Sequence, residues 1–430
     1  MNSAGRVWKA LILSAVGLAL AVAGAEGAFR LARLAAPGLF VGINTYADLQ
    51  SQVGSYFRPE TFIPFTLAPD YRGREMSQEY PGRFVSVNTN ALGLRMHETT
   101  QDKPPGLRRV LTLGDSYTFG VYVENDETWP ARLETELRAR GVRDVEVINA
   151  GYADGFCPSE HYAWLVNRGL AFRPDVVVYG FFVGNDLDCS EAGGERWVER
   201  DTRGLPRMIA NDSIRVDEHG RIRARVARAD TVGAEGIYRL PVLRDLYTAV
   251  IVYNGARVVA RKLGLGARRA PASGGATAAG TTPPPPFPWV LQAASTPQMQ
   301  RDEAGLFRLV RGMRDVAAEH GALFALVMIP TNFQVEPRFL EDRFLQRMLP
   351  PADYGPQRVR RDFFQEMKPM LDRDGILHVD LLRAMLARPG KYYPDNGEIH
   401  FNPRGNAFAA AVIADALAPI LARPAAAVVR

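Results

Sequence analysis

Residues 110–117 read V-L-T-L-G-D-S-Y, and this stretch decides the fold. Its first four residues are apolar or β-branched without interruption, a pattern typical of a parallel strand that is buried on both faces. Directly after the strand, Ser116 would open a turn or a short helix. Ligands of open parallel sheets bind at the carboxyl ends of the strands, so chemistry is expected at Ser116.

Strands and helices alternate on both sides of one long interruption. Five strands with helices between them predict an α/β fold with a parallel sheet. In chain order we expect a strand at 110–113, a helix at 127–140, a strand at 145–149, a helix at 159–171 with Ser159 as its N-cap, a strand at 175–183, a helix at 301–319, a strand at 323–330, a helix at 356–373, a strand at 376–381, and a helix from Asn402-Pro403 to about Leu421.

The remaining segments suggest how the chain is divided. Residues 31–105 contain many Pro, Gly, Tyr and Phe residues, which predicts an irregular, β-rich prelude that packs on the main domain. The main domain is expected at 106–188 and 299–430, with an insertion at 189–298. Within the insertion, the Pro/Gly/Ala-rich stretch at 266–288 has the composition of an extended spacer.

A second feature of the insertion is the apolar stripe at 247–263. Its spacing fits an amphipathic helix, which either faces a core or lies near a membrane. The core-facing interpretation is the more common one, and we favour it.

Composition excludes several classes of protein. Hydrophobic residues make up 47% of the chain and charged residues 23%, as in globular proteins with a large core. The net charge is only +5, and the basic residues are scattered, so no nucleic-acid partner is expected. The sequence shows no cluster with metal-ligand spacing, so neither a metal nor another cofactor is implied.

The first thirty residues indicate export. Arg6 and Lys9 precede an uncharged apolar run at 10–25, and Glu26 follows it. The run suits a signal anchor or a cleaved signal peptide, since small-residue cleavage sites occur at 21–25. We favour an anchor that holds the protein at a membrane, facing the periplasm or the cell exterior; cleavage would release a secreted protein. A buried N-terminal helix of a soluble protein is the third interpretation.

The chain has two cysteines, Cys157 and Cys189. Each follows a motif at a predicted strand end, so an oxidising compartment would allow a disulfide between them. Two buried free thiols remain the alternative, because sequence does not give the Cα separation.

Four residues have the chemistry that acyl transfer requires. Ser116 is a candidate nucleophile, and His400, in a loop before the last helix, is its candidate base. The backbone N–H groups of Ser116 and Gly151 and the side-chain amide of Asn185 could bind an oxyanion. Gly151 belongs to N-A-G at 149–151, and Asn185 to G-N-D at 184–186.

These motifs, in this order, resemble those of the SGNH/GDSL hydrolase family over about 105–188 and 300–421. The resemblance implies a flavodoxin-like three-layer α/β/α sandwich with a parallel five-stranded sheet, in which Ser116, Gly151, Asn185 and His400 take the roles just described. The apolar N-terminal segment and the stretch N-T-N-A-L-G-L-R at 88–95 look like the membrane-associated bacterial members, which often act on O-acyl groups of surface glycans.

One position departs from the family pattern. The last block usually reads D-x-x-H, but Gly397 stands three residues before His400. The orienting carboxylate would then be Asp395 or Glu398, and spacing in a loop does not choose between them. Asp115 and Asp186 are better interpreted as loop-fixing side chains.

Three functions remain open at this point. The leading hypothesis is an exported serine esterase that hydrolyses O-acyl esters of a small molecule or a glycan, with acetyl groups on envelope polysaccharides as one substrate class. The second is an O-acyltransferase that uses the same serine with a sugar hydroxyl as acceptor. The third is a non-catalytic envelope protein that binds a glycan or a partner through the same cleft. The absence of a G-x-S-x-G elbow argues against an α/β-hydrolase.

Overall fold

The structure is a computed structural model of the 430-residue chain. The chain forms two compact units, one made of residues 1–55, 80–83 and 225–283, and a larger one made of 56–79, 84–224 and 284–430. The structure describes residues 3–35, 45, 56–58, 60–76, 84–152, 156–187, 197–209, 214–216, 222–224, 240–262, 290, 297–341, 363–395 and 399–423.

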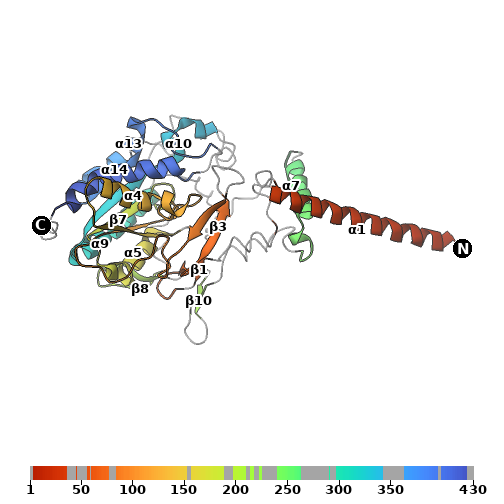
Figure 1. The fold of residues 1–430 in the computed structure, drawn as a ribbon, viewed down its shortest axis with the longest axis horizontal. Coiled ribbons are helices and arrows are strands. Elements are labelled where there is room, and N and C mark those ends of the chain that lie inside the picture. The colour runs from red at the N-terminus through yellow and green to blue at the C-terminus, as the bar shows by residue number, and fades with distance from the viewer. Residues whose placement is uncertain are drawn as a thin grey trace. The chain divides into compact units, whose positions relative to one another are not determined.

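A five-stranded parallel sheet forms the centre of the larger unit (Figure 1). The strands lie in the order β13–β12–β7–β5–β6, which is the flavodoxin-like order and confirms the predicted sheet. The winding of the sheet reverses between β5 and β7, where ligands bind in such folds. The strands are β5 (Arg108–Gly114), β6 (Val145–Gly151), β7 (Val176–Phe182), β12 (Leu323–Ile329) and β13 (Leu377–Asp380).

Helices cover both faces of the sheet, which explains why its strands are apolar without alternation. Every residue of β6 and β7 is buried. On one face α4 (Trp129–Ala139) packs against α14 (Pro403–Leu421), and on the other α5 (Pro158–Asn167) packs against α9 (Pro297–Glu319) (Figure 1). The predicted three-layer α/β/α sandwich is therefore confirmed.

The start of α14 shows how local sequence sets an element. The side chain of Asn402 accepts a hydrogen bond from Gly405 N at 2.9 Å, and Pro403 occupies the first turn, where its missing N–H is not needed. The predicted start and end of this helix are both confirmed. Because α14 packs on α4, the loop just before it is held at a defined place over the sheet.

Shorter elements complete the larger unit. Antiparallel pairs form within the predicted prelude and the predicted insertion. These elements are β1 (Phe57–Arg58), β2 (Thr66–Leu67), β3 (Arg72–Met76), β4 (Phe84–Asn88), α3 (Ser116–Phe119), η2 (Asn125–Glu127), η3 (Gly169–Phe172), β8 (Trp197–Arg200), β9 (Pro206–Ile209), β10 (Ile214–Val216), β11 (Ile222–Ala224), α10 (Asn332–Val335), η7 (Pro337–Glu341), α12 (Phe363–Arg373) and α13 (Leu381–Ala387).

The structure differs from the sequence prediction at three places. The N-cap of α5 is Cys157 and not Ser159, because Pro158 already occupies the first helical position and Ser159 Oγ donates to Glu160 instead. Helix α13 was not predicted, since it follows β13 without a loop and Asp380 caps it directly. Residues 31–35 belong to the N-terminal helix and not to the prelude. The part of the predicted 356–373 helix before 363 and the spacer at 266–288 lie outside the described residues.

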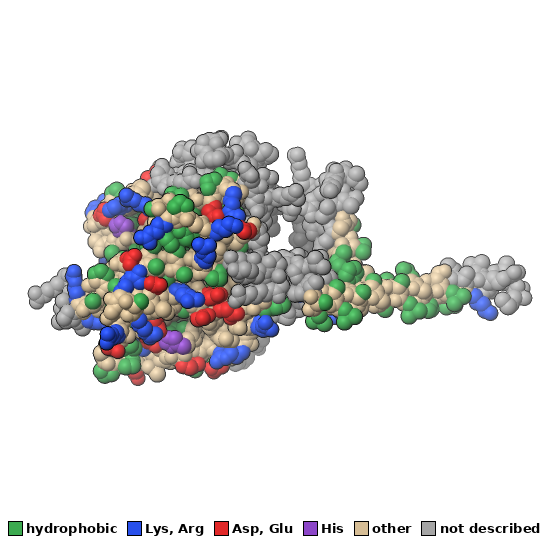
Figure 2. Space-filling model, turned by 45° about the horizontal axis from the view of Figure 1, so that its top comes forward, with side chains coloured by type: hydrophobic (Ala, Val, Ile, Leu, Met, Phe, Trp, Pro, Cys, Tyr) green, Lys and Arg blue, Asp and Glu red, His purple; other side chains and the backbone are tan. Residues whose placement is uncertain are grey.

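The smaller unit contains α1 (Ser3–Ala35), η6 (Leu243–Asp245) and α7 (Tyr247–Lys262). Two helices of the described residues are long and apolar enough to span a membrane. One is α14, half of which is buried in the larger unit, as expected for a core helix. The other is the Ile12–Ala35 part of α1, of which only 6% is buried, and hydrophobic side chains line it (Figure 2).

His161 of α5 is an ionisable side chain in the core of the larger unit. It is fully buried, near the rings of Phe156 and Tyr179 at centroid distances of 5.9 and 5.5 Å. Neither ring nitrogen has a hydrogen-bond partner among the described residues. Burial without a partner lowers the pKa of His161 to about 3, so the imidazole is neutral at neutral pH.

We expect the substitution His161→Phe to protect the protein against acid. The pKa of His161 is about 3 in the folded chain and 6.5 unfolded, so only the unfolded state binds the proton between these values. The free energy of unfolding should fall by up to about 1.4 kcal/mol per pH unit below 6.5 in the wild type, and the variant should lack this contribution. Urea unfolding from pH 7.5 to pH 5 measures the difference, with the exposed His320→Asn as control. A constant difference between His161→Phe and the wild type across this range would contradict the expectation.

Candidate active site

Three glycines in neighbouring strands make room for the turn that holds Ser116. Gly114 of β5 lies beside Gly151 of β6 and Gly180 of β7 in the sheet register, and we call the three the glycine row. A Cβ atom at Gly151 would lie 2.2 Å from Phe119 N, and one at Gly114 would lie 2.1 Å from Thr118 Oγ1. Gly114 also has φ of +150°, which other residues rarely adopt. Only glycines therefore allow α3 to lie directly on the sheet.

Ser116 and His400 form a hydrogen-bonded pair. Ser116 is the first residue of α3, at the carboxyl end of β5, and His400 lies in the loop before α14. Ser116 Oγ and His400 Nε2 are 2.8 Å apart, although 284 positions separate the residues in the chain. At this distance an imidazole nitrogen can accept the serine proton, which is what makes a serine nucleophilic.

The loop before α14 is fastened to the sheet unit on both sides of His400. The Tyr117 hydroxyl donates to the carbonyl of Ile399, and the ring of Tyr117 lies 5.0 Å from the imidazole. Asn402 N donates to Tyr392 O at 3.0 Å, and the buried Tyr393 hydroxyl donates to a carbonyl at the end of β12 at 2.8 Å. The residue that follows the serine therefore orients the histidine loop.

Asp115 connects the serine turn to Asn185. Its Oδ1 accepts from Tyr117 N at 3.0 Å, and its Oδ2 accepts from Asn185 Nδ2 at 3.3 Å. Burial raises the pKa of Asp115 to about 6, while these hydrogen bonds and the charge of His400 act in the opposite direction. One hydrogen of the Asn185 amide is thus used by Asp115.

Asp186 fixes the turn after β7. Its Oδ2 accepts from Tyr179 Oη and from Phe182 N, both at 2.9 Å. Burial raises the pKa of Asp186 well above its ordinary value, and the neighbouring Asp115 raises it further. Both carboxyls therefore act as hydrogen-bond acceptors that hold the loops of the site, as their loop-fixing interpretation requires.

The N–H of Gly151 is already used in this structure. It donates to the side-chain oxygen of Asn149 at 3.0 Å. Binding an oxyanion would require this bond to open, so the proposed donor role of Gly151 competes with a hydrogen bond inside the N-A-G motif. What the structure shows for Gly151 is the close packing against α3 described above.

Asp395 does not meet His400 in the structure. Its carboxylate binds Lys391 Nζ at 3.0 Å and Arg338 Nη1 at 2.5 Å, and its side chain is 62% exposed. Both cations lower the pKa of Asp395. No described hydrogen bond joins Asp395 to His400. Glu398, the other candidate, lies outside the described residues and stays a prediction.

Cys157 lies at the start of α5 and is disulfide-bonded. The other cysteine of the chain, Cys189, lies outside the described residues, so the predicted pairing of the two stays a prediction.

Arg95 supports the serine turn from behind, and sequence reasoning did not assign it a role. Arg95 is 1% exposed, and its guanidinium donates to the carbonyls of Phe119, Gly120 and Val123, which follow or end α3. A further bond joins its Nε to Asn125 Oδ1 at 3.0 Å, and the cation lies 4.6 Å from the centroid of the Phe119 ring. Burial lowers the pKa of Arg95 to about 10, so the side chain remains charged. The available signal was its place in the family-like stretch 88–95.

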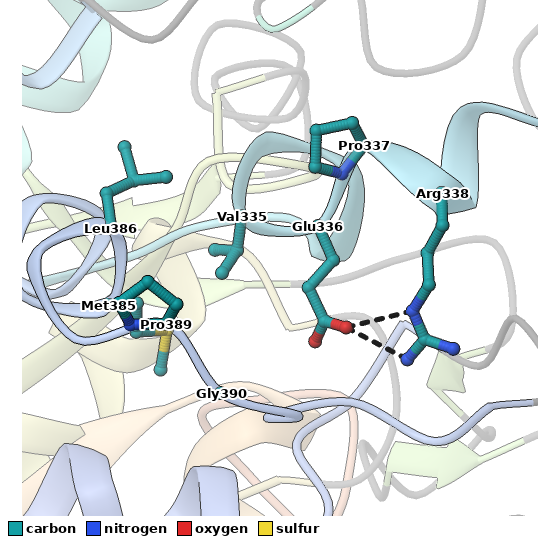
Figure 3. Close-up of a pocket in the computed structure, with 8 residues that line it drawn as sticks. All are labelled: Val335, Glu336, Pro337, Arg338, Met385, Leu386, Pro389 and Gly390. Carbon is teal, nitrogen blue, oxygen red and sulfur yellow. Dashed lines mark hydrogen bonds and ion pairs between the residues drawn. The ribbon is translucent and has the colours of Figure 1, made fainter.

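Two hollows lie near the loop that holds His400. One, of about 10 Å³, is lined by His400 itself together with Val121, Tyr122, Val123, Pro394, Phe401 and Asn402. The other, of about 290 Å³, has apolar side chains from α10 and α13 and the Glu336–Arg338 ion pair at its wall (Figure 3). Glu336 Oε1 also accepts from Tyr392 N at 3.1 Å, so the larger hollow is attached to the histidine loop.

Comparisons with known proteins give only a structural likeness. No family model and no curated protein matches the chain. The lipase/acylhydrolase from Enterococcus faecalis aligns with a TM-score of 0.35 and 14% identity, over 73% of this chain and 96% of that chain. The structure of TesA aligns with a TM-score of 0.34 and 14% identity, over 73% and 99%. A G-D-S-L family lipolytic protein from Desulfitobacterium hafniense aligns with a TM-score of 0.31 and 13% identity, over 72% and 99%. The functional argument therefore rests on the site itself.

We expect Arg95→Met to destabilise the protein strongly. The substitution removes the donors but keeps the length of the side chain, and it leaves buried carbonyls at the end of α3 without partners. The free energy of unfolding should fall by about 3–5 kcal/mol, as when one partner of a buried charged network is removed. Denaturant unfolding of the full chain in detergent measures this loss.

Two further variants calibrate the Arg95 result. Arg95→Lys keeps a charge and one or two of the bonds, so it should lie between Arg95→Met and the wild type. The exposed Arg74→Met, in the same prelude, should change stability by less than about 0.5 kcal/mol. If Arg95→Met were no less stable than Arg74→Met, the supporting role of Arg95 would be wrong.

Proposed function

We propose that the protein is an exported, membrane-anchored serine esterase that hydrolyses O-acyl esters. The observation that supports this most directly is the 2.8 Å contact between Ser116 Oγ and His400 Nε2 at the carboxyl edge of the sheet. The contact lies at the reversal point of the sheet, where open α/β folds bind their ligands.

In the proposed reaction Ser116 Oγ attacks the ester carbonyl carbon while its proton passes to His400 Nε2. The tetrahedral intermediate collapses when His400 returns the proton to the leaving alcohol oxygen, and an acyl-serine remains. A water molecule then attacks the acyl carbon while His400 takes its proton. The bond between the acyl carbon and Ser116 Oγ breaks, His400 returns the proton to Oγ, and the carboxylic acid and free serine are formed. Each bond that forms is matched by one that breaks.

The negative oxygen of the intermediate needs donors that are already in place. Ser116 N–H, at the start of α3, and the second hydrogen of the Asn185 amide supply two. Asp115 orients the Asn185 amide through its 3.3 Å hydrogen bond. Gly151 N–H would be a third donor only after releasing Asn149.

Acetyl groups on envelope or extracellular polysaccharides are the substrate class that suits an exported esterase. A transferase would use a sugar hydroxyl instead of water in the last step, and product analysis separates the two reactions.

Membrane anchoring is supported by α1. The helix is continuous from Ser3 to Ala35, so it passes through both predicted cleavage positions at 21–25 without a break. A helix of this length, left uncleaved, would hold the protein at a membrane. The catalytic unit would then face the periplasm or the cell exterior.

We expect Ser116→Ala to reduce the hydrolysis of p-nitrophenyl acetate by at least about 10³-fold in kcat, because the acyl-enzyme can no longer form. His400→Gln should cause a loss of similar size, and the two losses should not add. Initial rates of the full chain in detergent, with acetate and butyrate esters, measure the effect. Ser159→Ala is the matched control, since Ser159 Oγ donates to Glu160 and not to His400. Undiminished hydrolysis by the Ser116→Ala variant would contradict a mechanism in which Ser116 is the nucleophile.

A second pair of variants identifies the carboxylate behind His400. Asp395→Asn should leave kcat within about twofold, because Asp395 is bound to two cations at the surface. Glu398→Gln should lower kcat by about 10²-fold or more if Glu398 orients the imidazole. A loss in Asp395→Asn alone would reverse the assignment, and no loss in either variant would indicate a Ser–His dyad. The exposed Asp415→Asn, which breaks a comparable pair with Arg140, serves as control.

A further inference from the structure

Charged residues mark both ends of the apolar part of α1, and its length can be compared with the thickness of a bilayer. Lys9 precedes the uncharged run and Glu26 ends it, so residues 10–25 span about 24 Å at 1.5 Å per residue. With Trp8 at one end the length approaches the roughly 30 Å hydrocarbon thickness of a bilayer. Side chains such as Leu13 and Leu20 are about 70% exposed in the structure. Glu26 would therefore lie at the surface of the membrane.

At this boundary α7 is fastened to α1. Glu26 Oε2 accepts from both Thr248 N and Thr248 Oγ1 at 3.1 Å, which places a carboxylate at the N-terminus of α7. Arg30 binds the other oxygen of Glu26 at 2.8 Å and donates to Asp245 O at 2.9 Å. One turn further along α1, the Arg33 guanidinium binds the Tyr247 hydroxyl and lies 4.9 Å from the centroid of its ring. Figure 1 shows α7 beside the C-terminal end of α1.

Glu26 is itself evidence that this contact is specific. Glu26 is 8% exposed although α1 is otherwise largely uncovered. A buried carboxylate requires partners, and Thr248 and Arg30 provide them. The first ionisable residue beyond the apolar run is thus the one that holds α7.

Apolar side chains remain exposed on and before α7. Val250 is fully buried, whereas Val252, two residues later and on the opposite side of the helix, is 66% exposed. In the segment that leads into α7, Leu240, Val242 and Leu243 are exposed as well. The sequence of α7 contains Arg257, Arg261 and Lys262 and no acidic residue.

We propose that α7 and the segment 240–246 form an in-plane membrane-binding element, which inserts these four apolar side chains into the lipid interface next to α1. The proposal rests on the anchor role of α1. The partner of these exposed side chains is the bilayer surface. The apolar run of α1 ends where α7 is attached, so the exposed side chains continue the lipid-facing surface of the anchor. The basic, acid-free composition of α7 matches anionic headgroups.

This arrangement would fix how the anchor helix meets the surface. A single spanning helix can tilt and rotate, and its tilt is set by the groups at its ends. An in-plane helix joined to α1 through Glu26, Arg30 and Arg33 restricts both motions. It corresponds to the membrane-facing interpretation of the 247–263 stripe, the alternative to a core-facing helix.

The test uses depth-dependent quenching in the full chain. Single cysteines at Val252→Cys, Leu240→Cys, Leu18→Cys in α1 and Thr135→Cys on the exposed side of α4 are labelled with an environment-sensitive fluorophore under non-reducing conditions, with the unsubstituted chain as background. The proteins are reconstituted in phosphatidylcholine–phosphatidylglycerol vesicles that contain nitroxide lipids. Labels at 252 and 240 should be quenched at least about threefold more than the label at 135, and most strongly by nitroxides near the headgroup. The label at 18 should be quenched best by nitroxides deep in the chains.

The pattern of quenching distinguishes the α7 proposal from the anchor role of α1. Quenching at 18 with none at 252 and 240 leaves the anchor intact and overturns the α7 proposal. No quenching at 18 overturns both the anchor and the proposal. A blue-shifted label at 252 that nitroxides do not reach indicates a protein surface, such as a second copy, and also overturns it. Ester hydrolysis by the Val252→Cys and Leu240→Cys variants is measured in parallel, so a failed esterase is distinguishable from a failed membrane contact.

Discussion

The close approach of one short helix to the sheet is the constraint on which the site depends. Three glycines lie abreast in β6, β5 and β7, and their missing side chains leave the space that α3 occupies. Ser116 is the first residue of α3, so the height of its hydroxyl above the sheet is set by the contacts of the Phe119 backbone with Gly151 and of the Thr118 side chain with Gly114. A methyl group at Gly151 would overlap the backbone of Phe119. Such rigid placement suits a nucleophile, because small errors in position are costly in catalysis.

Around this platform the site is assembled from distant parts of the chain. The serine follows the first strand, Asn185 follows the third, and the histidine precedes the last helix. Tyr117 and Asp115, the two neighbours of the serine, each reach one of those parts: the Tyr117 hydroxyl binds the Ile399 carbonyl, and Asp115 binds the amide of Asn185. The residues on either side of the nucleophile thus align the other two groups with it.

Sequence patterns predicted the sheet well because its strands are covered on both faces. Uninterrupted apolar runs and an Asn-Pro helix start are local signals, and β7 and α14 matched them closely. The missed features depend on contacts across the chain or on adjacency. Helix α13 begins directly after β13, so no loop residues between them indicated a new helix. Pro158 is the first residue of α5, so the helix begins before Ser159. For the site, the Ser116–His400 contact followed from motif order, whereas the surface ion pairs of Asp395 and the carbonyl contacts of Arg95 are visible only in three dimensions.

Arg95 has a consequence for the order in which the protein matures. It precedes strand β5 of the five-stranded sheet in the chain, so it is synthesised before its carbonyl partners at 119–123. Until α3 lies on the glycine row, this guanidinium has water in place of those carbonyls. His400 is synthesised last of all. The turn that carries Ser116 is therefore supported by an earlier segment, which contains Arg95, and contacted by a later one, which contains His400. An incomplete nascent chain therefore lacks the imidazole that Ser116 contacts in the folded protein.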